Sequence, residues 1–137
     1  MDLDAAIAVH AQWKDRLAQY LTDPDGSLNP EVIARDDACE LGQWLAGDGA
    51  ALAGRPEYAR LVDAHRAFHT SAALVVRGAH SGMEMSEVIA LGSGSPYAHH
   101  SSDVIRSILK LRDFQRHVGP PVTVLGGCMP ASEAAPS

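Results

Sequence analysis

The sequence predicts an all-α protein, an antiparallel four-helix bundle with short extra helical turns and a disordered C-terminal tail. Apolar residues recur at three- and four-residue spacing over most of the chain. Ala and Leu are plentiful, and aromatic residues make up only 5% of the sequence, which favours helix. No segment of convincing length shows the alternation of a β-strand. Amphipathic helices must bury their apolar faces against each other, and an antiparallel bundle is the simplest arrangement that does so.

The first predicted helix spans residues 2–21. Asp2 or Asp4 can cap its free N–H groups, and an acidic first turn suits the helix dipole. His10 lies within the apolar face, whose other members are Leu3, Ile7, Leu17 and Leu21. A lone histidine in such a face is most often a core residue with a structural hydrogen bond. His10 is therefore a candidate ligand only if other ligands join it.

The second predicted helix is short, from about residue 36 to residue 46, and follows a loop over residues 22–30. Asp36 and Asp37 are expected to cap it, which places Cys39 in the first turn. There the helix dipole stabilises a thiolate. Gly42 costs about 1 kcal/mol relative to Ala inside a helix. We therefore expect another part of the protein, a helix or the metal site, to approach its backbone closely.

The third predicted helix opens near Pro56 and runs to about residue 79. His65 and His69 both lie in its apolar face, together with Leu61, Val62, Phe68, Ala72 and Val76. Residues at i and i+4 share a helix face, so the two imidazoles can reach one point in space. The opposite face is expected to be solvated and carries Arg60, Asp63 and Arg66.

The fourth helical region spans residues 83–114 and is interrupted at residues 91–96. Its first part carries a short apolar set of Met85, Val88 and Ile89. After the interruption, Ser102 or Asp103 is expected to cap a helix that ends at Phe114. The buried candidates of that helix are Val104, Ile105, Ile108, Leu109 and Leu111.

The remainder of the chain, residues 118–137, consists mostly of Pro, Gly, Ala, Ser and Val without periodicity. Such a composition cannot bury enough apolar surface to fold, so a disordered tail is predicted. Residues 1–117 then form a single domain.

The charge pattern excludes several classes of partner. The formal net charge is −6 and no run of Lys or Arg occurs, whereas affinity for nucleic acid comes mostly from neutralising phosphates. The same argument counts against an anionic membrane surface. No apolar stretch approaches the roughly 20 residues that span a bilayer, and the acidic N-terminus lacks the basic start of a signal peptide. A cytoplasmic location is expected, where a disulfide between Cys39 and Cys128 is not favoured.

Four potential metal ligands come from three predicted helices: His10, Cys39, His65 and His69. Three imidazole nitrogens and one thiolate form a tetrahedral set suited to Zn²⁺. The set carries a charge of about +1, which costs less to bury than the roughly −2 of a four-thiolate site. The other histidines are not assigned to a metal; these are His80, His99, His100 and His117.

Two alternatives to a closed zinc site remain. Zinc hydrolases often carry His-Glu-x-x-His, but the general-base Glu is missing between His65 and His69. A haem bundle also uses His and Cys, but no Cys-x-x-Cys-His occurs. A role other than that of an enzyme is expected, because four protein ligands leave no position for a catalytic water.

Three short motifs occur in order: HAQW from His10, CELGQW from Cys39 and HRAFH from His65. Together they resemble the bacterial chemoreceptor zinc-binding domain over about residues 3–115. The resemblance implies a four-helix bundle in which these three residues and His69 hold Zn²⁺. It also implies a sensory role in signalling pathways such as chemotaxis. The signal is zinc itself or an oxidant, such as hypochlorous acid, that acts on the zinc-bound cysteine.

Members of this family are attached to chemoreceptors or diguanylate cyclases, or occur alone, and some act as dimers. This sequence shows no transmembrane segment, signalling coiled coil or cyclase domain. We therefore expect a stand-alone sensor that acts as a homodimer, binds a partner from a chemoreceptor or cyclase pathway, or buffers zinc.

The chemistry of the cysteine predicts how such a sensor would switch. A zinc-bound thiolate can be oxidised to sulfenate, and loss of this ligand would loosen the second helix. Asp36 or Asp37 is a candidate hydrogen-bond acceptor for a ligating imidazole.

Overall fold

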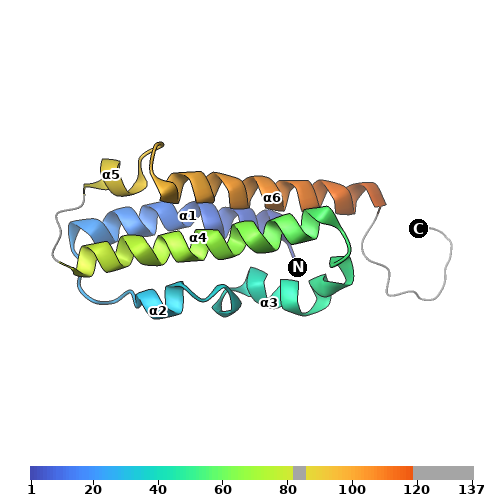
Figure 1. Ribbon diagram of the computed structural model, residues 1–137, viewed down its shortest axis with the longest axis horizontal. Coiled ribbons are helices and arrows are strands. Elements are labelled where there is room, and N and C mark those ends of the chain that lie inside the picture. Colours follow the sequence, from blue (N-terminus) through green and yellow to red (C-terminus); the bar gives the residue numbers. More distant parts are fainter. Residues whose placement is uncertain (82–85, 119–137) are drawn as a thin grey trace.

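The computed structural model describes residues 1–81 and 86–118, and these residues form helices and turns without a strand. Three long helices lie side by side along the long axis of the molecule (Figure 1): α1 (Leu3–Thr22), α4 (Pro56–His80) and α6 (Pro96–Val118). Helix α6 runs in the opposite direction to α1 and α4. The predicted all-α class is confirmed.

The chain between α1 and α4 forms short pieces rather than one helix. They are α2 (Pro30–Ile33), the 3₁₀ turn η1 (Asp36–Ala38), α3 (Glu40–Ala46) and the 3₁₀ turn η2 (Asp48–Leu52). Figure 1 shows α2 and α3 following one another along α4. A further short helix, α5 (Glu87–Leu91), precedes α6. The described chain therefore does not form four continuous helices, because a segmented stretch lies where the second was predicted.

The long helices begin where local chemistry favours a start. The Asp2 carboxylate accepts hydrogen bonds from the backbone N–H groups of Asp4 and Ala5, at 2.9 and 3.2 Å, and so caps α1 as predicted. Helix α4 opens with Pro56, whose missing N–H is not needed there.

The predicted start of the last helix at Ser102 or Asp103 is wrong. Helix α6 begins at Pro96, and the Ser95 hydroxyl accepts a hydrogen bond from the Ala98 N–H at 3.1 Å. A Ser-Pro pair therefore supplies both the cap and a first residue that suits a helix start.

The prediction for the second helix needs a correction. Residues 36–38 form the turn η1, and Cys39 is the N-cap of α3 with extended backbone angles, φ −94° and ψ 143°. Cys39 thus precedes the first turn of α3, and neither Asp36 nor Asp37 caps a helix with its side chain. The expected close approach at Gly42 is confirmed. A Cβ atom at that position would lie 1.8 Å from the Asp36 carbonyl oxygen, so only glycine lets η1 pack against α3.

The core lies between the apolar faces of the long helices. Every predicted member of the α4 face is buried or partly buried, as is every predicted member of the α1 face. In α6, Val104, Ile108 and Leu111 are fully buried, whereas Ile105 and Leu109 are partly buried.

The predicted apolar set before α6 is wrong where it can be checked. Val88 and Ile89 are 79% and 70% exposed, and the buried residues of α5 are Ala90 and Leu91. Met85 lies outside the described residues, as does almost all of the predicted tail, since α6 extends to Val118.

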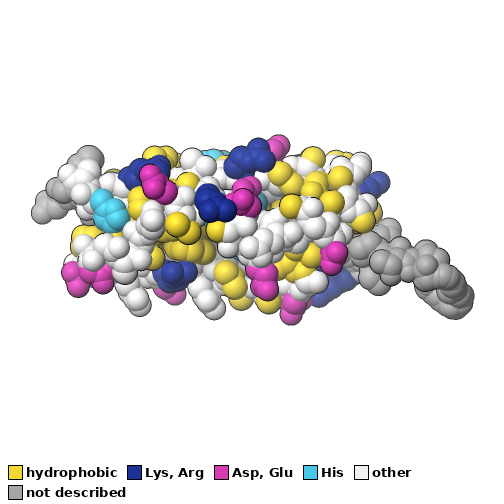
Figure 2. Space-filling model, turned by 90° about the horizontal axis from the view of Figure 1, so that it is seen from below, with side chains coloured by type: hydrophobic (Ala, Val, Ile, Leu, Met, Phe, Trp, Pro, Cys, Tyr) yellow, Lys and Arg dark blue, Asp and Glu magenta, His cyan; other side chains and the backbone are white. Residues whose placement is uncertain are grey.

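The face that carries α2 and α3 is shown in Figure 2. Apolar side chains reach the surface there between scattered acidic and basic groups, and no large block of one charge sign is visible. Among the described helices, none combines the length and the apolar character that crossing a membrane requires.

Candidate metal centre

Four side chains from three parts of the chain converge near the middle of the structure. His10 comes from α1, Cys39 from the start of α3, and His65 and His69 from successive turns of α4. One ligand atom of each residue lies within 4.8 Å of the corresponding atoms of the other three. The residues that the sequence singled out are therefore brought together, and they could hold one metal ion.

Backbone carbonyl groups fix the orientation of two of the imidazole rings. His10 Nδ1 donates to the Ala6 carbonyl oxygen at 2.7 Å, and His69 Nδ1 donates to the Ile33 carbonyl oxygen at 2.9 Å. A carbonyl oxygen only accepts, so the proton of each neutral ring must sit on Nδ1. The Nε2 atom of both rings therefore carries a lone pair, which is the arrangement that a metal requires.

Two distances inside this group, whose ligand atoms all lie within 4.8 Å of one another, are close to those around a tetrahedral zinc ion. With Zn–N near 2.0 Å and Zn–S near 2.3 Å, two nitrogen ligands lie about 3.3 Å apart, and a nitrogen and a sulfur lie about 3.5 Å apart. His65 Nε2 and His69 Nε2 are 3.0 Å apart, and the Cys39 sulfur lies 3.8 Å from His10 Nε2. These distances differ from the tetrahedral values by no more than a few tenths of an ångström. The donor set of three imidazoles and one thiol is one that Zn²⁺ favours.

The environment of His65 differs between its two ring nitrogens. Its Nδ1 atom is buried and has no hydrogen-bond partner among the described residues. Its Nε2 atom faces His69 Nε2, which carries a lone pair. In the tautomer of His65 with its proton on Nδ1, a cation between the rings would take up both Nε2 lone pairs, and the site residues therefore fit the group that their chemistry implies.

Burial keeps the three imidazoles neutral. Burial, together with charge repulsion from the neighbouring His69 and His10 rings, lowers the pKa of His65 to about 3. Burial also lowers the pKa of His10 and of His69, against the hydrogen bonds to Ala6 and Ile33, which raise it. Neutral imidazole is the form that binds a metal, so the fold holds these ligands ready for binding.

The four candidate ligands differ in their access to solvent. The three histidines are at most 5% exposed, whereas Cys39 is only partly buried. Phe68 packs edge-on against His10 and His69, with ring centroids 5.2 and 5.5 Å apart. Cys39 is thus the most exposed of the four candidate ligands.

The expected hydrogen bond from a ligating imidazole to Asp36 or Asp37 is not formed. Asp37 instead accepts from Arg35 at 3.0 Å, and Asp36 lies 3.9 Å from Arg66. Asp36 acts on His69 only through its charge, which raises the pKa of that ring. The hydrogen-bond partners of the His10 and His69 rings are the backbone carbonyls of Ala6 and Ile33, which no side-chain pattern could have indicated.

The unassigned histidines lie apart from this cluster where the structure describes them. His80 is hydrogen-bonded to the Tyr20 hydroxyl, and His99 lies 3.5 Å from Asp103 within α6. Arg60, Asp63 and Arg66 are exposed, as predicted. Cys128 and the side chain of His117 fall outside the described residues.

One of three comparisons with known proteins finds a match. A search of curated proteins and a search of solved structures each find no significant match. A family model described as the chemoreceptor zinc-binding domain matches residues 10–76, a span that begins at His10 and includes Cys39, His65 and His69. The resemblance predicted from the three motifs is therefore confirmed over residues 10–76, a shorter span than the predicted 3–115.

Proposed function

We propose that this chain is a zinc-binding sensory module in which Zn²⁺ is held by His10, Cys39, His65 and His69. The observation that carries the proposal is the convergence of three imidazole nitrogens and one sulfur within 4.8 Å. Two of the rings are fixed by backbone carbonyls in the tautomer that binds a metal. Zinc would supply a cation that satisfies the facing lone pairs and joins α1, α4 and the start of α3.

A structural and regulatory site fits these residues better than a catalytic one. The cluster contains no carboxylate, so a general base for hydrolysis is missing. Four protein ligands also fill a tetrahedral zinc ion and leave no position for a water molecule. We propose for the same reason that the protein is not an enzyme.

We propose further that Cys39 is the responsive ligand. It is the most exposed of the four. Reaction of its thiolate with hypochlorous acid transfers an oxygen atom to sulfur and releases chloride, which leaves a sulfenic acid. The sulfenic acid is a poorer ligand than the thiolate, so the start of α3 would lose its bond to the rest of the site.

The segment from α2 to α3 is the element that such a change would release. It is tied to α4 by the Ile33 carbonyl, which accepts from His69. Further along the segment, the Leu45 carbonyl accepts a hydrogen bond from the Tyr58 hydroxyl. Loss of the Cys39 ligand would weaken the attachment of η1 and the start of α3 to the metal site, and it would alter the surface around α2 and η1. A partner protein of a chemoreceptor or cyclase pathway, or a second copy of the chain, would read that change.

Metal analysis of purified protein tests the proposal. Wild type is expected to hold one zinc ion per chain, and Cys39→Ser or His65→Ala should lose most of it, whereas His99→Ala should not. Addition of about one equivalent of hypochlorous acid should release zinc and add one oxygen to Cys39, observed by mass spectrometry. A wild-type protein that keeps its zinc and an unmodified Cys39 under hypochlorous acid contradicts the redox part alone.

A further inference from the structure

A cavity of about 440 Å³ opens beside Cys39, between α1 and the segment that carries α2 and η1. This volume lies within the range of roughly 300–1,000 Å³ typical of small-molecule sites. Cys39 and His69 line it, so the cavity reaches two of the four candidate metal ligands. Its apolar wall is formed by Val9, Trp13, Leu28, Val32 and Ile33.

The charged groups around this cavity are mostly basic. Arg16 and Arg35 line it, against one acidic residue, Glu40. Arg35 is already paired with Asp37 at 3.0 Å. Arg16 forms no ion pair within the described chain, and its guanidinium lies 4.1 Å from the centre of the Trp13 ring. An unpaired cation is thus held at the edge of an apolar wall, in a chain whose net charge is −6.

Large apolar side chains are also left in water at the rim. Val9 and Val32 are each 50% exposed, and they stand on the two elements that border the cavity. A ligand with an apolar body would remove this surface from water. A cavity lined by one unpaired guanidinium and one carboxylate suits a single negative charge better than a doubly charged phosphate.

We propose that this cavity binds a small amphipathic monoanion, an aromatic or branched-chain carboxylate or sulfonate. The apolar body lies against Trp13 and Val32, and the acid group pairs with Arg16. The bound molecule covers the Cys39 sulfur and shields it from reagents in solution. The consequence for sensing rests on the proposed function, in which Cys39 is a metal ligand, whereas the binding itself does not.

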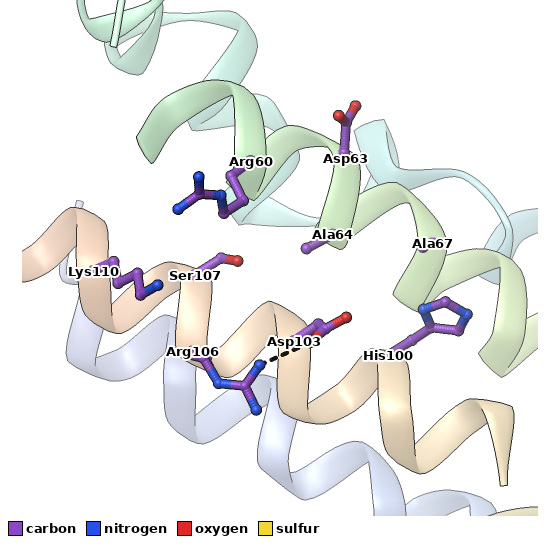
Figure 3. Close-up of a pocket in the computed structure, with 9 residues that line it drawn as sticks. All are labelled: Arg60, Asp63, Ala64, Ala67, His100, Asp103, Arg106, Ser107 and Lys110. Carbon is purple, nitrogen blue, oxygen red and sulfur yellow. Dashed lines mark hydrogen bonds and ion pairs between the residues drawn. The ribbon is translucent and has the colours of Figure 1, made fainter. Parts of the chain in front are cut away.

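A second groove offers a matched control. It lies between α4 and α6, where Arg60 and Lys110 flank Ser107 and Arg106 donates to Asp103 at 3.0 Å (Figure 3). None of the four candidate metal ligands lines this groove. Replacement of Arg60 therefore removes an exposed arginine from a different surface.

Tryptophan fluorescence of the full chain, titrated with 4-phenylbutyrate, measures binding next to Trp13. The uncharged 4-phenylbutyramide is the matched ligand. We expect saturable quenching by the acid, and affinity at least about fivefold lower for the amide or for Arg16→Gln. Arg16→Lys should recover much of the affinity, and Arg60→Gln should stay within about twofold of wild type. Equal affinity for acid and amide, or no saturable quenching of wild type, overturns the assignment.

Shielding of the sulfur is measured as the rate at which iodoacetamide alkylates Cys39 in a zinc-free Cys128→Ser background. Saturating 4-phenylbutyrate should slow alkylation several-fold in this protein but not in the Arg16→Gln variant. An unchanged rate under saturation overturns the shielding. Zinc content is measured separately. Ligand binding without zinc would refute the proposed function and leave this site intact, whereas zinc without ligand binding would refute only this inference.

Discussion

Substitution of Gly42 by alanine tests how the fold positions the cysteine. The new Cβ would lie 1.8 Å from the Asp36 carbonyl oxygen and 2.7 Å from its carbon. An ordinary contact needs at least 3.4 Å, so the two backbones must separate by about 3.4 − 1.8 = 1.6 Å. The obstacle is backbone rather than a flexible side chain, and it lies three residues before Cys39. A metal site tolerates ligand displacements of only about 0.2 Å.

Two opposing effects set the size of the change. Alanine is the better helix former by about 1 kcal/mol, which alone would stabilise α3. Overpacking against a backbone costs about 1–3 kcal/mol or more, and here it acts on the turn that carries Cys39. We expect zinc affinity to fall about 10- to 100-fold, while the stability of the zinc-free protein falls by no more than about 2 kcal/mol.

Competition with a chromophoric chelator measures the zinc affinity, and thermal unfolding of the zinc-free protein measures the stability. Gly54→Ala is the matched control, because a Cβ there meets nothing within 4 Å. Zinc affinity equal to wild type in Gly42→Ala would refute the claim that this glycine positions the cysteine.

Three further predictions concern the ligands and the core around them. The zinc-free protein should be most stable above about pH 6.5 and lose stability as the pH falls toward 3. The folded-state pKa values of the three histidines lie below the unfolded value, so unfolding takes up protons in this range. Thermal unfolding at a series of pH values measures the effect, and His65→Leu should flatten the dependence on pH. Phe68→Ala should lower the free energy of unfolding in denaturant by about 3–5 kcal/mol, since Phe68 is fully buried against the His10 and His69 rings. Leu74→Ala, at a residue 58% exposed, should lower it by well under about 1 kcal/mol. Equal losses of stability in the two variants would contradict the packing. Tyr58→Phe removes the hydrogen bond to the Leu45 carbonyl and should destabilise the protein by about 1 kcal/mol. The zinc stoichiometry should not change. A loss of zinc would show instead that the C-terminal end of α3 also positions the site.

The sequence was most informative where side chains alone decide the structure. The apolar faces of α1 and α4 follow from helical spacing, and the i, i+4 pair of His65 and His69 follows from it too. The convergence of the four candidate ligands could be predicted because three motifs occur together in order. Motif spacing does not depend on the exact path of the chain between the motifs, so the break between α2 and α3 did not affect this prediction.

The errors occur where backbone groups or short elements decide the structure. Two aspartates before Cys39 resemble a helix cap, but the contact between Gly42 and the Asp36 carbonyl places a 3₁₀ turn there instead. The partners of His10 and His69 are backbone carbonyls, which every residue has and which leave no mark in the sequence. Val88 and Ile89 are apolar yet exposed, because a helix as short as α5 buries only its last residues.

X-ray absorption of the zinc-loaded protein at the zinc edge tests the central claim most directly, because it counts the ligand atoms around the metal. We expect one zinc ion per chain with one sulfur at about 2.3 Å and three nitrogens at about 2.0 Å, and a loss of the sulfur signal in Cys39→Ser. A zinc ion without sulfur, or one that keeps its sulfur signal in Cys39→Ser, would contradict it.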